Sequence, residues 1–149
     1  MDAGRAKHKA LELLARREHS GHELRTKLVR KGCPEALANN VVSELEAARL
    51  VSDERFADSL VRVRTERGHG PLRIERELRD KGVDAELIKT MLDSSDPLWL
   101  DLVRRIRRKK FGKAAIKNYK ERARQARFLQ YRGFTYDQIQ RALASDESD

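Results

Sequence analysis

The chain has 149 residues, of which 38% are charged and only 5% aromatic, and its formal net charge is +9. This composition favours a helical protein with small, distributed cores over one built around a single large core. The N-terminal segment is polar and no apolar run approaches the roughly 18 residues of a membrane span, so we expect a cytoplasmic protein without a signal peptide.

Residues 1–51 have the pattern of three short helices. Apolar side chains at helical spacing predict the first helix over residues 6–18. Ser20 and Glu23 form a capping-box pattern at the start of the second helix, and Pro34 suits the first turn of the third. The net charge of this segment is +3.

Residues 52–95 repeat this pattern. Ser52 and Asp53 can cap the first helix of the segment, Gly68-His69-Gly70 ends it, and Pro71 begins the next. In that middle helix, basic and acidic side chains alternate at i, i+4 spacing, which predicts a solvated and salt-bridged face. The net charge of the segment is −1, so it offers no general attraction for an anion.

Residues 96–149 form the third segment, and its net charge is +7. A cap followed by a helix-starting proline stands at Asp96-Pro97, and a second capping box is expected at residues 135–138. Between them the pattern predicts one long helix over residues 113–132. The acidic tail SDESD is expected to fray.

A glycine preceded by a basic residue recurs about every 50 residues, at Gly32, Gly82 and Gly133. Apolar residues stand four positions before each glycine and one, six and ten positions after it. A helix that ends in a left-handed residue favours glycine there, and a cation in its last turn suits the helix dipole. The sequence therefore predicts an all-α fold in which three tandem three-helix repeats, residues 1–51, 52–95 and 96–149, form an elongated, curved array.

The sequence has no pattern typical of a catalytic or metal site. It lacks a phosphate-binding glycine-rich loop, and Cys33 falls at a repeated apolar position, so we interpret Cys33 as a small core residue. His19 and His22 have no acidic or thiol partner at ligand spacing and are interpreted as solvated loop residues. We therefore expect no enzymatic activity, no cofactor and no metal.

Basic residues are concentrated between Arg104 and Arg132, where thirteen Lys and Arg stand with a single acid, Glu121. Five of them recur at spacings of three and four in the predicted long helix and would share its outward face: Lys113, Lys117, Lys120, Arg124 and Arg127. We interpret this stripe as a contact for a polyanion, because a merely solvated helix would mix in acids. Further candidate contacts with DNA or a partner filament are Arg62, Arg64, Arg67, Arg73, Arg76, Arg104 and Arg108.

Two stretches, DERFADSLVRVRTERGHGPLRIERELRDKG (residues 53–82) and RFLQYRGFTYDQI (residues 127–139), resemble the RecX family of recombinase regulators. The resemblance covers essentially the whole chain. It implies a non-enzymatic, tandem three-helix protein that binds the groove of RecA filaments on DNA and inhibits them by limiting growth or promoting disassembly. It thereby implies a role in recombination, DNA repair and the SOS response. The implied partners are the RecA filament and single- and double-stranded DNA, with no membrane, and we expect a monomer.

The residues themselves leave a second function open, that of a basic helical DNA-binding module acting independently of a recombinase. No helix after a short turn has the mixture of Asn, Gln and Arg typical of a base-reading helix. Evenly spaced lysines would contact phosphates, and such contacts position a protein without reading sequence. A nuclease is a third alternative, which the lack of an acid–metal cluster opposes.

Overall fold

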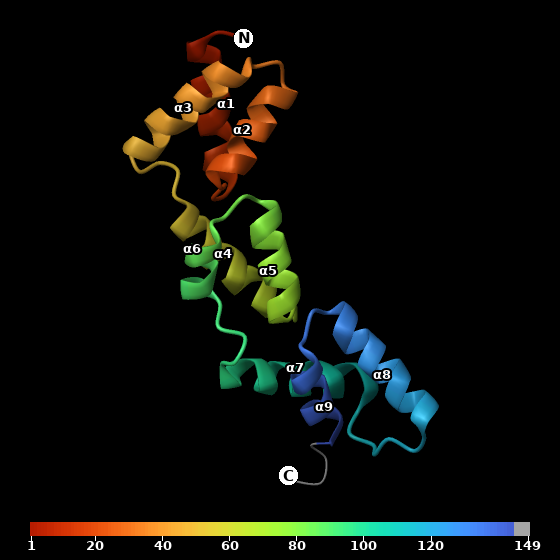
Figure 1. Cartoon of the computed structure of the whole chain (residues 1–149). Helices are drawn as coiled ribbons and strands as arrows, with labels where there is room; N and C mark the ends of the chain where they lie inside the picture. Colours follow the sequence, from red (N-terminus) through yellow and green to blue (C-terminus); the bar gives the residue numbers. More distant parts are fainter. Residues whose placement is uncertain (145–149) are drawn as a thin grey trace. The chain divides into compact units, whose positions relative to one another are not determined.

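The computed structural model describes residues 1–144, and within them the backbone forms nine helices and no strand (Figure 1). In chain order these are α1 (Ala3–Arg16), α2 (Gly21–Arg30), α3 (Glu35–Ala47), α4 (Asp53–Glu66), α5 (Pro71–Asp80), α6 (Ala85–Met91), α7 (Pro97–Phe111), α8 (Tyr119–Tyr131) and α9 (Tyr136–Ala144). The predicted all-α class and its three successive groups of three helices are confirmed. The acidic tail SDESD lies outside the described residues.

The described residues cluster into two compact units. The first unit comprises Met1–Leu60 and Leu78–Met91, and the second comprises Val61–Glu77 and the described chain from Leu92 onward. Helices α4 and α5 therefore each contribute one end to each unit. The repeat boundaries 1–51, 52–95 and 96–149 remain a prediction about sequence repeats.

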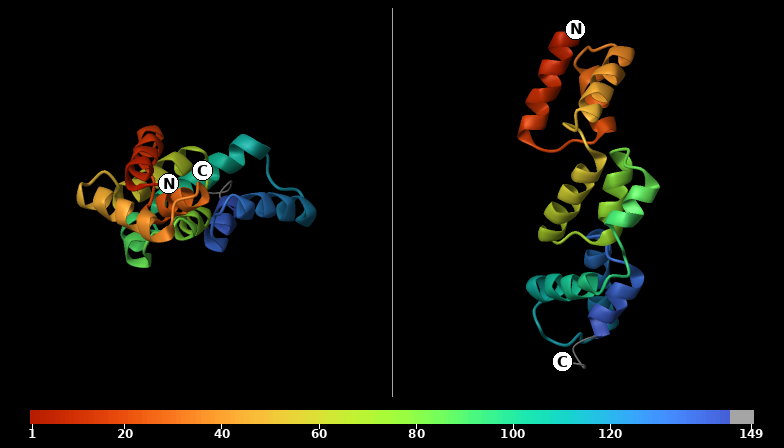
Figure 2. Two further views of the ribbon diagram at one scale, coloured as in Figure 1. Left: turned by 90° about the horizontal axis from the view of Figure 1, so that it is seen from above. Right: turned by 90° about the vertical axis from the view of Figure 1, so that its left-hand side faces the viewer.

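The first unit has its core where α3 packs against both α1 and α2 (Figure 2). Leu24, Leu28 and Val42 are completely buried there, because the apolar faces of these amphipathic helices turn towards one another. Cys33 is 3% exposed and belongs to the same core, which confirms its interpretation as a small core residue.

Each of the three repeat glycines ends a helix in the left-handed region, as predicted. The φ angles are 98° at Gly32, 77° at Gly82 and 99° at Gly133. The amide after each glycine donates to the carbonyl four residues before the glycine, at 3.0 Å for Cys33–Leu28 and Val83–Leu78 and 3.3 Å for Phe134–Leu129. This Schellman motif brings the two side chains together. The repeat is therefore apolar at both positions, and all six side chains are buried.

Gly133 meets a steric constraint that Gly32 does not. A Cβ at Gly133 would overlap the backbone nitrogen and Cβ of Arg73, whereas no described atom lies within 4 Å of that position at Gly32. We expect Gly32→Ala to lower the free energy of unfolding by about 1–2 kcal/mol, the cost of a left-handed alanine. Gly133→Ala should lower it further, by roughly 2–4 kcal/mol. Urea unfolding followed by circular dichroism measures both, and equal losses would contradict the steric constraint.

Of the two predicted capping boxes, the one at residues 135–138 forms completely, whereas the one at residues 20–23 forms only its Ser20 N-cap bond. The Thr135 hydroxyl accepts from the Gln138 amide at 3.1 Å, and the Gln138 side chain accepts from the Thr135 amide at 2.9 Å. The Ser20 hydroxyl likewise accepts from the Glu23 amide, at 3.0 Å. The Glu23 carboxylate, however, does not complete this box, because it bonds to cations of its own unit.

Glu23 is the centre of a buried ion-pair cluster in the first unit. Its side chain is 4% exposed, and its oxygens lie 3.0 Å from Arg17 Nη1 and 3.0 Å from Lys81 Nζ. Burial opposes ionisation of this carboxyl, but the hydrogen bonds from Arg17 and Lys81 outweigh it and lower the pKa of Glu23 to about 2. The cluster thus joins the α1–α2 turn to the end of α5.

The interpretation of His19 as a solvated residue is wrong, whereas His22 is exposed as expected. The His19 ring is 1% exposed, with Nδ1 3.1 Å from the Arg17 carbonyl oxygen and Nε2 2.9 Å from Lys27 Nζ. An ammonium group can only donate, so Nε2 accepts and Nδ1 donates to the carbonyl, which is the pattern of a neutral ring. Burial lowers the pKa of His19 and favours the same form.

The pKa of Glu23 makes stability depend on pH. Its folded pKa lies below the usual value near 4.5, so its ion pairs stabilise the fold above that pH and are lost as pH falls towards 2. We expect Glu23→Gln to cost about 2–3 kcal/mol near pH 7, and this difference from wild type to shrink between about pH 5 and pH 2. Glu86→Gln, which removes an exposed partner of Lys89, is the control. Urea unfolding across this range measures both, and a pH-independent difference for Glu23→Gln would contradict the assignment.

Candidate nucleic-acid interface

All of the predicted contact residues fall in the second unit. They lie at the end of α4 and the start of α5, on α7, and in the segment from residue 113 to residue 127. The structure therefore gathers into one compact unit the candidates that the sequence scattered over two repeats. Their individual surroundings differ, and only some of them have a side chain available to a partner.

The helix predicted over residues 113–132 is too long. α7 ends at Phe111 and is followed by Gly112, whose φ is 80°, and α8 begins only at Tyr119. Asn118 caps α8, because its side-chain oxygen accepts from a backbone amide of the first turn at 2.8 Å. Nothing in the periodicity pointed to this cap, since the alanines and lysines of residues 113–117 are themselves good helix formers.

The prediction that five basic residues share the outward face of one helix is therefore wrong. Lys113 and Lys117 lie in the loop between α7 and α8, and only Lys120, Arg124 and Arg127 lie on α8. Arg124 is also engaged within the protein, because it pairs with Glu121 at 2.7 Å and its guanidinium lies 4.9 Å from the centre of the Phe111 ring. All five side chains are nevertheless exposed, so this part of the unit remains strongly basic.

Helix α7 carries a second basic surface. An open cavity of about 570 Å³ is lined by Asp101, Arg104, Arg105, Arg108 and Lys109. Arg104 and Arg108 were predicted contacts, whereas Arg105 and Lys109 were missed. A dense run of cations does not reveal which of its members face outward: Arg107, in the same run, is 1% exposed and donates from Nε to Gln125 at 2.8 Å.

The arginines of α4 and α5 have separate roles. Arg64 donates two hydrogen bonds to the carboxylate of Glu77, both at 2.8 Å, so its guanidinium is engaged within the unit. Arg73 lies over the ring of Tyr131, with 5.2 Å between the guanidinium carbon and the ring centre. Three other predicted contacts of this region are exposed: Arg62, Arg67 and Arg76.

The two stretches that carry the family resemblance meet in the second unit. The Gly70 amide donates to the Arg132 carbonyl at 2.7 Å, and the Leu72 amide donates to the Gly133 carbonyl at 2.9 Å. A side chain at Gly70 would prevent this approach, because its Cβ would lie 2.5 Å from the Gly133 carbonyl oxygen. Main-chain bonds therefore fix the start of α5 against the end of α8.

An open groove of about 480 Å³ lies beside these bonds, lined by Leu72, Arg73, Arg76, Gln130, Tyr131 and Gly133. Leu72 is 47% exposed and Tyr131 is 75% exposed, so the groove presents apolar surface together with two guanidinium groups. None of these lining residues carries a carboxylate. The sequence predicted Arg73 and Arg76 as contacts but not Tyr131, which only the family motif RFLQYRGF could have drawn attention to.

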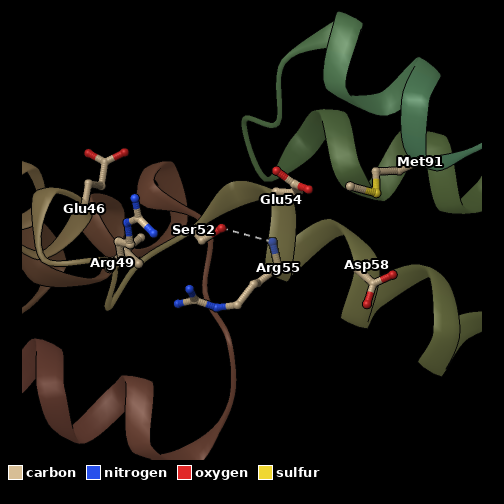
Figure 3. Close-up of a pocket in the computed structure, with 8 residues that line it drawn as sticks. Glu46, Arg49, Ser52, Glu54, Arg55, Asp58 and Met91 are labelled. Atoms are coloured by element: carbon tan, nitrogen blue, oxygen red, sulfur yellow. Dashed lines mark hydrogen bonds between the residues drawn. The ribbon is translucent and has the colours of Figure 1, made fainter.

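The first unit has a different hollow, at the end of α3 and the start of α4 (Figure 3). It measures about 640 Å³ and is lined by Glu46, Arg49, Val51, Ser52, Glu54, Arg55, Asp58 and Met91. Its three carboxylates outnumber its two guanidinium groups, and both Glu46 and Arg55 already pair with charged neighbours. This mixed charge makes the hollow a poor site for a polyanion.

Residues 1–144 contain neither a metal-binding cluster nor a membrane-spanning helix. No three His, Cys, Asp or Glu side chains in this range come together as they would to hold a metal ion. None of the helices described is both long enough and apolar enough to cross a membrane. The side chains best suited to binding a ligand lie on the basic surfaces and in the groove of the second unit.

Tandem three-helix units define a small all-helical protein, and its exposed basic surface is suited to contact with an anion. Family models for RecX match each helix group in order: the first three-helix domain at residues 6–45, the second at 52–92 and the third at 100–143. The chain belongs to the RecX family.

Individual relatives agree with this assignment. The chain is 43% identical over 140 residues to the regulatory protein RecX of Halorhodospira halophila, which covers 94% of this chain and 87% of the relative. It is 38% identical over 144 residues to that of Vibrio campbellii, which covers 97% and 93%. Its fold is similar to a crystal structure of RecX from Lactobacillus salivarius, with a TM-score of 0.83 at 21% identity, over 99% of this chain and 97% of the other.

Proposed function

We propose that this protein regulates a RecA recombinase by binding the RecA–DNA filament and limiting its growth or activity during recombination and DNA repair. The observation that carries the proposal is family membership across all three helix groups, since the curated relatives bear the name regulatory protein RecX. The basic surface of the second unit supports it, because a filament assembled on DNA offers phosphates to such a surface.

The proposed mechanism is steric and involves no catalysed reaction. A monomer in the cytoplasm occupies filament surface that growth or catalysis requires, and it uses no cofactor. The exposed side chains proposed to contact DNA or recombinase are Arg62, Arg67, Arg76, Lys113, Lys117, Lys120 and Arg127, and the half-buried Arg104 and Arg108 join them from the cavity on α7. Arg64 and Arg124 are less available to a partner, because they already pair with Glu77 and Glu121.

Recombinase ATPase activity tests this proposal directly. We expect the protein to inhibit ATP hydrolysis by RecA on single-stranded DNA when it is present at far fewer copies than RecA, because one bound molecule obstructs many subunits of a growing filament. The measurement is a coupled ATPase assay with the protein titrated in, together with filament lengths by electron microscopy. Unchanged ATPase and unchanged lengths, with DNA binding intact, would instead indicate a DNA-binding module that acts without a recombinase.

Two charge-reversal variants, a test and a matched control, show where the electrostatic contact lies. Changing Lys113, Lys117 and Lys120 to Glu should flatten the dependence of log K on log salt for single-stranded DNA by about 2, because each phosphate neutralised by a cation contributes roughly 0.7 to the slope. Folding should be unaffected, because all three side chains are exposed.

The matched control for this variant changes three exposed cations of the first unit to Glu: Arg5, Arg16 and Arg30. It alters the net charge by the same amount, so it reports the effect of charge alone. We expect the control to keep most of the wild-type salt slope and to inhibit the recombinase nearly as well as wild type. Equal effects of the two variants would show that the contact is not localised to the second unit.

A further inference from the structure

We propose that the groove beside Tyr131 binds an unpaired nucleobase, stacked on the Tyr131 ring, with the neighbouring phosphate held by Arg73 and Arg76. The inference deepens the proposed function, on which it rests for its nucleic-acid partner. It assigns to one groove of the second unit a preference for single-stranded over double-stranded DNA.

The aromatic ring is the first part of this site. Tyr131 is 75% exposed, although it stands in a groove with the half-exposed Leu72. The guanidinium of Arg73 lies over the ring, 5.2 Å from its centre, and this cation–π contact favours the orientation in which one ring face meets the guanidinium. The ring face turned away from Arg73 offers a stacking surface, which every unpaired base can use because each base has a π-face.

The charge of the groove is the second part. Arg73 and Arg76 line it and none of its lining residues carries a carboxylate, so it attracts an anion. The pKa of the nearby His69 agrees with this positive charge. Burial lowers that pKa most, and the adjacent Arg73 and further arginines lower it as well. Gln130 adds a side-chain amide that can donate to or accept from a base edge.

The groove is built in advance, which favours a specific ligand over a chance contact. The bonds from the Gly70 amide to the Arg132 carbonyl and from the Leu72 amide to the Gly133 carbonyl fix its two sides. Binding a ligand therefore requires little ordering of the backbone, and the remaining cost is that of fixing the exposed side chains. The volume of about 480 Å³ falls within the range of small-ligand sites, and an open groove of this size suits one nucleotide.

The stacking surface also selects among nucleic acids. In a duplex each base already has both faces covered by its neighbours, so a duplex can offer only its phosphates to this groove. An acidic peptide without aromatic residues would satisfy the arginines but would leave the exposed ring of Tyr131 without a stacking partner. The combination of ring, amide and guanidinium groups thus favours an unpaired nucleotide.

The test measures binding of the full-length protein to a fluorescein-labelled oligothymidylate and to a labelled duplex, without recombinase. We expect Tyr131→Ala to weaken binding to the oligothymidylate by between about fivefold and a hundredfold, the range for loss of one stacked base. Duplex affinity should stay within about twofold of wild type, and the salt slope should not change, because no charge is removed. Tyr131→Phe keeps the ring and should bind like wild type.

Two further variants keep the test decisive. Tyr136→Ala removes a tyrosine of similar exposure, 79%, from outside the groove and should leave binding unchanged. Tyr131→Leu keeps apolar bulk without an aromatic face, so it should bind as weakly as Tyr131→Ala even if truncation to alanine disturbs folding.

Five results of the binding assay would overturn the proposal. They are failure of the wild-type protein to bind the oligothymidylate, wild-type affinity in Tyr131→Ala, wild-type affinity in Tyr131→Leu, an equal loss in Tyr136→Ala, and an equal loss on the duplex. If Tyr131→Ala instead kept its oligothymidylate affinity but no longer inhibited RecA, the groove would bind a protein segment and the nucleobase assignment would be wrong. Because the binding assay contains no recombinase, it can succeed even where the ATPase test of the proposed function fails.

Discussion

Helix endings at left-handed glycines determine the positions of the candidate functional side chains of this protein. Four helices of the described chain, α2, α4, α5 and α8, end in this way, and each has the Schellman pair of main-chain bonds. At α4, for example, the Gly68 amide donates to Thr65 and the His69 amide to Arg64. The motif reverses the chain within two or three residues, so the next helix begins where the last one stopped.

In the second unit the same endings create the groove. Gly133 ends α8 and Gly70 precedes α5, and the two backbones approach closely enough to bond because neither residue has a side chain. Arg73 and Tyr131 are held together by this approach, one in the first turn of α5 and the other at the last residue of α8. The stability of this unit and the geometry of the groove thus depend on the same glycines, and substitutions there would disturb both at once.

Local rules explain what the sequence predicted well and what it did not. Caps, prolines and repeat glycines act within a few residues, so the helix groups, the Ser20 and Thr135 N-caps and the buried apolar positions could be inferred from spacing alone. Three features could not be inferred in this way. The Asn118 cap was hidden by helix-forming neighbours, and the buried His19 ring contacts Arg17 and Lys27 although it stands at a break in the helical pattern. The Arg73–Tyr131 stack joins two segments that are far apart in the sequence. Of the candidate site, the sequence predicted the basic region but not its geometry.

The distribution of carboxylates explains why the surplus positive charge appears where it does. In the first unit a single buried acid, Glu23, binds Arg17 and Lys81, and Glu46 binds Arg25. The second unit has fewer acids than cations, so much of its positive charge remains uncompensated and can attract a partner. Such charges act over a Debye length and depend on salt, whereas an aromatic stack acts only on contact and hardly depends on salt. A surface with both would attract any nucleic acid at a distance and hold most tightly the one whose bases are unpaired.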